Sequence, residues 1–119
     1  DEVILTINKI HLKKKLYPND KLKNNVDKNI EVIKWSENLI VLAAHSGNGK
    51  HAYFNHLAKL SIGDIILLQY KEPIQYRLSF IYKTDMLPIH YNRRKKTLIL
   101  ITCCRKHRDK QLIFVAEAI

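Results

Sequence analysis

Short apolar segments rich in Ile, Val, Tyr and Phe alternate with polar segments along the whole chain. Segments of this length and composition, bounded by polar turns, are typical of β-strands. The predicted strands are residues 3–7, 10–16, 31–35, 39–44, 65–70, 75–83, 97–103 and 112–118. The turn-forming tripeptide Ser-Glu-Asn at 36–38 joins two of them into a hairpin. The pattern predicts a mostly antiparallel β-barrel or sandwich of seven or eight strands.

One segment has a helical rather than a strand pattern. After the break Ser-Gly-Asn-Gly at 46–49, residues 51–59 predict a short amphipathic helix with Phe54, Leu57 and Ala58 on its inner side. The segments 19–27, 84–96 and 105–110 are polar and predict surface loops. No internal repeat divides the chain, and 119 residues suffice for one core, so we expect residues 1–119 to form a single domain.

The chain is strongly basic, with a formal net charge of +10 at pH 7. Such a charge suits an anionic partner such as nucleic acid, a bilayer surface or an acidic wall polymer, but it also arises when Lys fills solvated positions. The longest apolar run has six residues, against the roughly 20 that a membrane-spanning helix needs. The chain begins at Asp1 without Met, and we read it as a soluble fragment.

The two cysteines, Cys103 and Cys104, are adjacent. Neighbouring residues on a strand point to opposite faces, so the pair is not expected to form a disulfide, and zinc-ligand spacing is missing. One useful thiol therefore remains, at the end of an apolar strand. His45 ends another apolar strand, and an imidazole near a thiol can activate it as a nucleophile. The alternative is that His45 is a surface or satisfied core residue and Cys103 a small buried one.

Several pieces of the chain resemble, in order, the motifs of the sortase family. The sequence LILITC at 98–103 is similar to the T-L-x-T-C strand end of sortases, with Ile99 at the usual position of Thr. LAAHSG at 42–47 resembles their histidine-bearing strand end. Residues 51–66, including L-x-x-G-D-x-I, and residues 112–117 are also of sortase type. Residues 3–12 resemble the opening strand, with Asn8 where proline is usual.

The resemblance implies a sortase-type β-barrel, antiparallel or mixed, and a cysteine transpeptidase that uses no metal and no organic cofactor. Cys103 would attack the carbonyl after the Thr of an L-P-x-T-G-like sorting signal and form a thioacyl enzyme. His45 would protonate the leaving amine and deprotonate the incoming one. An arginine would stabilise the oxyanion. Its usual position, at the start of the last strand, holds Gln111 here, so we expect Arg108 to take this role, with Arg105 as the alternative.

The resemblance also implies where substrate and partners bind. Thr102, Gln111 and Pro88 are expected to contact the substrate, Pro88 because segment 84–96 falls where sortases recognise the sorting signal. The partners would be the sorting-signal peptide of a surface protein or pilin and an amine of a cell-wall precursor or pilin subunit. We expect the protein to be tethered at the outer face of the bacterial cell membrane by an N-terminal anchor outside this fragment.

Three other readings compete with an active sortase. A caspase-like or papain-like protease fits the order of His45 and Cys103, 58 residues apart, but the motif Q-A-C-x-G and the necessary chain length are missing. A basic nucleic-acid-binding barrel needs exposed aromatics interleaved with Lys or Arg, whereas the aromatics here lie mostly within apolar strands; no nucleic-acid partner is therefore expected. A sortase fold with weak or mainly hydrolytic activity is suggested by Gln111.

Overall fold

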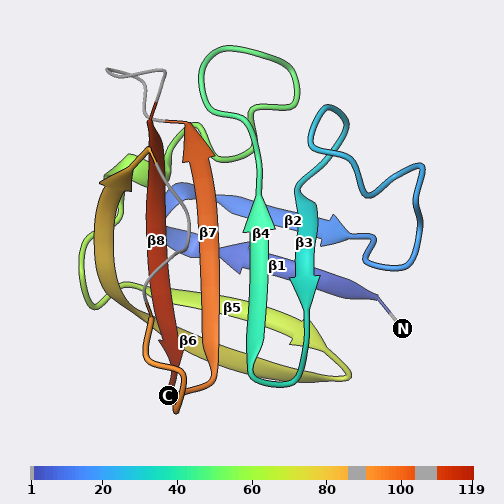
Figure 1. The fold of residues 1–119 in the computed structure, drawn as a ribbon. Helices are drawn as coiled ribbons and strands as arrows, with labels where there is room; N and C mark the ends of the chain where they lie inside the picture. Colours follow the sequence, from blue (N-terminus) through green and yellow to red (C-terminus); the bar gives the residue numbers. More distant parts are fainter. Residues whose placement is uncertain (1, 86–90, 104–109) are drawn as a thin grey trace.

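A computed structural model describes residues 2–85, 91–103 and 110–119. Within these residues the chain forms eight strands and two short 3-10 helices (Figure 1). The strands are β1 (Val3–Ile7), β2 (Leu12–Leu16), β3 (Glu31–Trp35), β4 (Leu39–Ala43), β5 (Ile65–Tyr70), β6 (Glu72–Thr84), β7 (Thr97–Cys103) and β8 (Gln111–Ala118). The 3-10 helices are η1 (Asn8–Ile10) and η2 (Leu57–Lys59).

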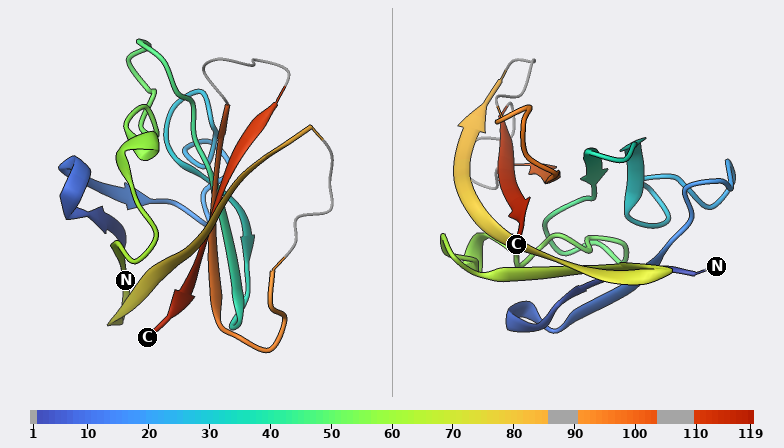
Figure 2. Two further views of the ribbon diagram at one scale, coloured as in Figure 1. Left: turned by 90° about the vertical axis from the view of Figure 1, so that its left-hand side faces the viewer. Right: turned by 90° about the horizontal axis from the view of Figure 1, so that it is seen from below.

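All eight strands belong to one strongly curved sheet with the order β2-β1-β5-β6-β8-β7-β4-β3. Among the described strands only β4 and β7 are parallel neighbours; the other pairs are antiparallel. The long strand β6 pairs with β5 through its first half and with β8 along most of its length, and the register shifts between Leu78 and Phe80. This irregularity accompanies the bend by which the sheet wraps round its core (Figure 2). The predicted mostly β, barrel-type fold is confirmed.

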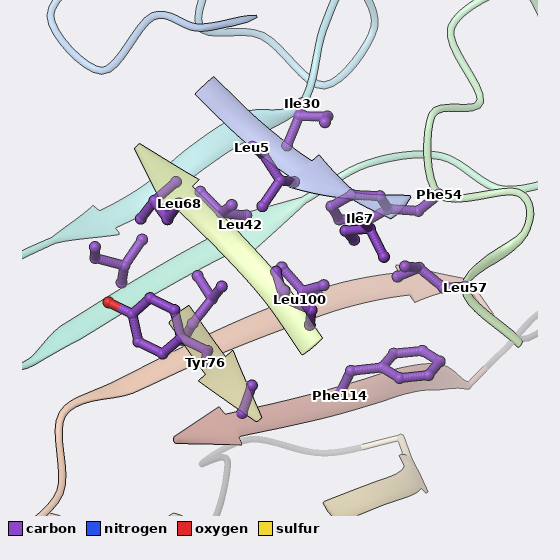
Figure 3. Packing of buried hydrophobic residues seen from close by; sticks show 14 of the residues in the cluster. Leu5, Ile7, Ile30, Leu42, Phe54, Leu57, Leu68, Tyr76, Leu100 and Phe114 are labelled. Carbon is purple, nitrogen blue, oxygen red and sulfur yellow. The ribbon is translucent and has the colours of Figure 1, made fainter. Parts of the chain in front are cut away.

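The main core fills the inside of the curved sheet. Alternating residues of the strands point inward, among them Leu5, Leu42, Leu100 and Phe114, each at most 1% exposed (Figure 3). Tyr76 is also completely buried, and this burial raises the pKa of its phenol. A smaller cluster of Val41, Ile99, Ile113 and Val115 forms on the opposite face of β4, β7 and β8. These three strands are therefore apolar on both faces, which explains their nearly continuous hydrophobic sequences.

The predicted helix over residues 51–59 does not form; only its end, η2, is a 3-10 helix. The Phe54 N–H donates to the carbonyl of His45 at 3.1 Å instead of to the residue four positions back. In the neighbouring turns an N–H donates to the carbonyl three positions earlier in the chain, as Ala52 N–H does to Gly49 O. Burial of Phe54 and Leu57 agrees with the prediction, but Ala58 is exposed. Docking on the end of β4 has outweighed the local helical pattern.

Asp64 links the turn before β5 to the N-terminal part of the chain. Its Oδ2 accepts hydrogen bonds from Lys9 Nζ at 2.8 Å and from the Ser61 N–H at 2.7 Å. The Lys9 side chain, followed by the Ser61 amide, holds the pKa of this carboxyl below its ordinary value. A carboxyl with a lowered pKa stabilises the fold at neutral pH, and this contribution disappears as the pH falls through its folded-state pKa.

We therefore expect Asp64→Asn to lower the free energy of unfolding at pH 7 by roughly 0.5–1 kcal/mol, the size usual for partly exposed charged pairs. The difference from the wild type should shrink as the pH falls below about 4. Urea unfolding at several pH values measures it. Glu37→Gln removes an exposed carboxylate elsewhere and is the control. A difference that stays constant down to pH 2 would contradict the ion-pair explanation.

Candidate active site

The carboxyl ends of β4 and β7 lie side by side because these two strands run parallel (Figure 1). Each β4 residue pairs with the β7 residue 58 positions later, up to Ala43 opposite Ile101. The contact continues beyond the strand, since Thr102 Oγ1 donates to Ala44 O at 2.9 Å. Continued two positions beyond the last pair, the same register would bring His45 opposite Cys103. The structure therefore puts the two strand ends that carry the predicted histidine and cysteine side by side.

The segment after His45 is attached to the cysteine strand. Ser46 Oγ donates a hydrogen bond to the carbonyl of Cys103 at 3.0 Å, and the Gly47 N–H donates to Asn55 Oδ1 at 2.9 Å. Cys103 itself is a free, half-buried thiol. A rigid strand end with an accessible thiol is a suitable position for a nucleophile.

The His45 imidazole has a carboxylate partner that the sequence did not indicate. Nε2 of His45 lies 2.8 Å from Oδ1 of Asp27, and the His45 side chain is 45% exposed. Asp27 belongs to the connection between β2 and β3, eighteen residues before His45. No motif marks this aspartate, because its contact with His45 depends on the path of the long irregular connection between β2 and β3.

Gln111 is the direct cross-strand partner of Cys103 between β7 and β8. Directly opposed residues in antiparallel strands project their side chains to the same face, with Cβ atoms about 5 Å apart. Gln111 is exposed, and Thr84 of β6 is opposite it on the other side. Arg108, Arg105 and Pro88 lie outside the described residues. The roles assigned to them, and to His45, Cys103, Thr102 and Gln111, stay predictions.

A cavity of about 400 Å³ opens next to Cys103, between the ends of β6, β7 and β8 and the segment 46–58. Thr102, predicted to contact substrate, lines this cavity but is only 4% exposed. Lys83 contributes a cation to the wall, which sequence reasoning did not identify. The lining residues are Ser46, Phe54, Asn55, Ala58, Ile81, Lys83, Thr102, Cys103, Leu112 and Phe114. The cavity is mainly apolar, with polar groups near the thiol.

The described residues contain no group of three or more His, Cys, Asp or Glu side chains placed to hold a metal ion. In the same part of the chain, no helix is long and apolar enough to cross a membrane. Among the described residues, the Cys103 thiol lies at the end of β7, the His45 imidazole follows the end of β4, the Asp27 carboxylate contacts His45 from the β2–β3 connection, and Lys83 lies in the cavity wall.

A thiol and an imidazole near the ends of adjacent strands in one curved sheet are the groups that cysteine-dependent acyl transfer uses. The Sortase domain model matches residues 5–119. The chain therefore belongs to the sortase family, a family of cysteine transpeptidases, and the resemblance drawn from the sequence is confirmed. The comparison with curated proteins gives no match.

Solved sortase structures share the fold. The Clostridium perfringens sortase D5 transpeptidase superposes with a TM-score of 0.79 at 22% identity, over 99% of this chain and 78% of that one. Sortase C1 from Streptococcus agalactiae gives 0.82 at 18% identity, over 98% and 66%. Clostridium perfringens sortase C, solved with the C-terminal cell wall sorting motif, gives 0.80 at 23% identity, over 98% and 69%.

Proposed function

We propose that this protein is a cysteine transpeptidase that cleaves an L-P-x-T-G-like sorting signal and transfers the acyl part to an amine. The observation that supports the proposal is the parallel pairing of β4 and β7, whose adjacent ends lead to His45 and to the half-buried thiol of Cys103. Family membership and the sorting motif solved with Clostridium perfringens sortase C support a peptide substrate of this kind.

The two half-reactions use the same two side chains. The Cys103 thiolate attacks the Thr carbonyl of the signal, and the tetrahedral intermediate collapses to a thioester as the amine of the next residue leaves with a proton from His45. An incoming amine then attacks the thioester, His45 takes its proton, and the thiolate of Cys103 is released. The product is a new amide bond, so no oxidant, reductant or external energy source is consumed.

The proposed partners and location follow from membership of the sortase family. The acyl donor is the sorting signal of a surface protein or pilin, and the acceptor is an amine of a cell-wall precursor or pilin subunit. The enzyme acts at the outer face of the bacterial membrane, held there by an N-terminal anchor. A weak or mainly hydrolytic sortase is the second candidate, because the residue opposite Cys103 is the neutral Gln111.

Intact-mass spectrometry tests the proposal directly. The protein is incubated with a small library of L-P-x-T-G-like peptides, and a mass gain equal to the N-terminal acyl fragment is expected on Cys103. Added triglycine should release the adduct and yield a ligated peptide. Release by water alone would favour the hydrolytic candidate. No adduct with any peptide, in a folded protein whose Cys103 reacts with iodoacetamide, would contradict the proposed function.

A further inference from the structure

We infer that Asp27 is a positioning residue for His45: its carboxylate fixes the proton on Nε2 of the imidazole and orients the ring at the thiol. The inference rests on the proposed function, since it assigns Asp27 a part in the same reaction. The contact that carries it is the 2.8 Å distance between His45 Nε2 and Asp27 Oδ1.

The chemistry of the pair determines the tautomer. An ionised carboxylate can only accept hydrogen bonds, so Nε2 of His45 must carry the hydrogen that it donates to Asp27. In the neutral ring the lone pair then lies on Nδ1, which becomes the nitrogen that exchanges protons with the thiol and the reacting amines. A histidine whose second nitrogen is held by a carboxylate keeps one orientation through both half-reactions.

Asp27 is itself held in place by a compact turn. Its N–H donates to Asn25 Oδ1 at 2.8 Å, and the Asn25 carbonyl accepts from the N–H groups of Lys28 and Asn29 at 2.9 and 2.8 Å. The Val26 N–H donates to Glu31 Oε1 at 2.9 Å. Asp27 therefore lies within a network of bonds that fixes its backbone, although its side chain is 77% exposed.

This turn is fastened to the sheet on both sides. The buried Asn29 donates through Nδ2 to the Lys15 carbonyl of β2 at 2.9 Å, and Ile30 is fully buried in the main core. On the β3 side, Asn24 Nδ2 donates to the Val32 carbonyl at 3.1 Å, and Asn24 Oδ1 accepts from the Val32 N–H at 2.6 Å. The carboxylate is thus presented to His45 from a scaffold, as an orienting group requires.

The contact between Asp27 and His45 is not explained by the stability of the fold. An ion pair as exposed as this one contributes little to the stability of the fold, because water and salt screen it. Within the folded protein, however, the contact distinguishes the two tautomers of His45, because only the Nε2–H form donates to the carboxylate. Asp27 should therefore matter for the rate of the reaction and for the His45 tautomer, and very little for the unfolding midpoint.

The test compares Asp27→Asn and Asp27→Ala with the wild type in two independent measurements. Side-chain ¹⁵N chemical shifts of His45, assigned with a His45→Gln variant, report the tautomer of the neutral ring; the wild type should show the Nε2–H form, and both variants a mixture. The kcat for peptide cleavage should fall about tenfold or more, with KM changed by less than about twofold. Asp20→Asn is the matched control, because Asp20 lies in the same connection and its carboxylate accepts from the Leu22 and Lys23 N–H groups of its own turn.

The two measurements separate this inference from the proposed function. If the wild type forms the thioacyl adduct but the Asp27 variants keep its tautomer or its kcat, the positioning role is wrong and the transpeptidase proposal stands. If the wild type forms no adduct, the transpeptidase proposal fails, and the tautomer alone decides whether Asp27 orients His45. Equal unfolding midpoints for all variants confirm that a change in kcat is not a loss of fold.

Discussion

Replacement of Cys103 by alanine should abolish formation of the thioacyl enzyme and lower peptide cleavage by a factor of at least about 10³, because no other group then forms the covalent intermediate. The fold should survive. The hydrogen bond from Ser46 Oγ reaches the main-chain carbonyl of Cys103, which alanine keeps, and the side chain lost is small and half-buried. Intact mass, cleavage kinetics and circular dichroism measure the three effects.

The neighbouring cysteine supplies the control. Cys104→Ala also removes one thiol, one position further along the chain. It should leave most of the activity, since the mechanism needs a single thiol. Equal loss of cleavage in the two variants, with both folded, would refute the assignment of Cys103 as the nucleophile. Residual cleavage in Cys103→Ala without an adduct would point to a different nucleophile or to direct attack by water.

Much of the sheet could be predicted from the sequence because its signals are local. The hairpin of β3 and β4 has strands of the right length around a turn in which Ser36 Oγ both donates to the Leu39 carbonyl and accepts from the Leu39 N–H. The bounds of β5 and β7 agree with the apolar runs. Segment 51–59 was assigned wrongly because contacts with the strand end, distant in sequence, decide its conformation.

The site was only partly predictable for the same reason. The motifs around His45 and Cys103 predict roles for both residues, but the alignment of their strand ends depends on the parallel pairing of β4 with β7, which no local pattern specifies. Asp27 and Lys83 carried no signal at all. Asp27 reaches His45 through the folding of the β2–β3 connection, and Lys83 reaches the cavity because β6 bends alongside β8.

A second large effect is expected from the oxyanion donor. If Arg108 supplies it, Arg108→Ala should lower kcat/KM about 10²-fold or more, the usual loss when one such donor is removed. Gln111→Ala should cost less, about threefold to tenfold, because a neutral amide makes weaker hydrogen bonds to a developing anion than a guanidinium does. Arg77→Ala, which removes an exposed arginine near the far end of β8, is the control.

The cross-strand register provides a rescue experiment. Because Gln111 lies directly opposite Cys103, Gln111→Arg places a guanidinium on the face that carries the thiol. In the Arg108→Ala background this change should recover at least about tenfold of the lost kcat/KM. Losses of no more than a few-fold in both alanine variants would show that neither residue stabilises the oxyanion. In that case Arg105→Ala would be the next variant to measure. If Arg108→Ala instead causes a large loss and Gln111→Arg does not restore it, a side chain at position 111 does not reach the oxyanion.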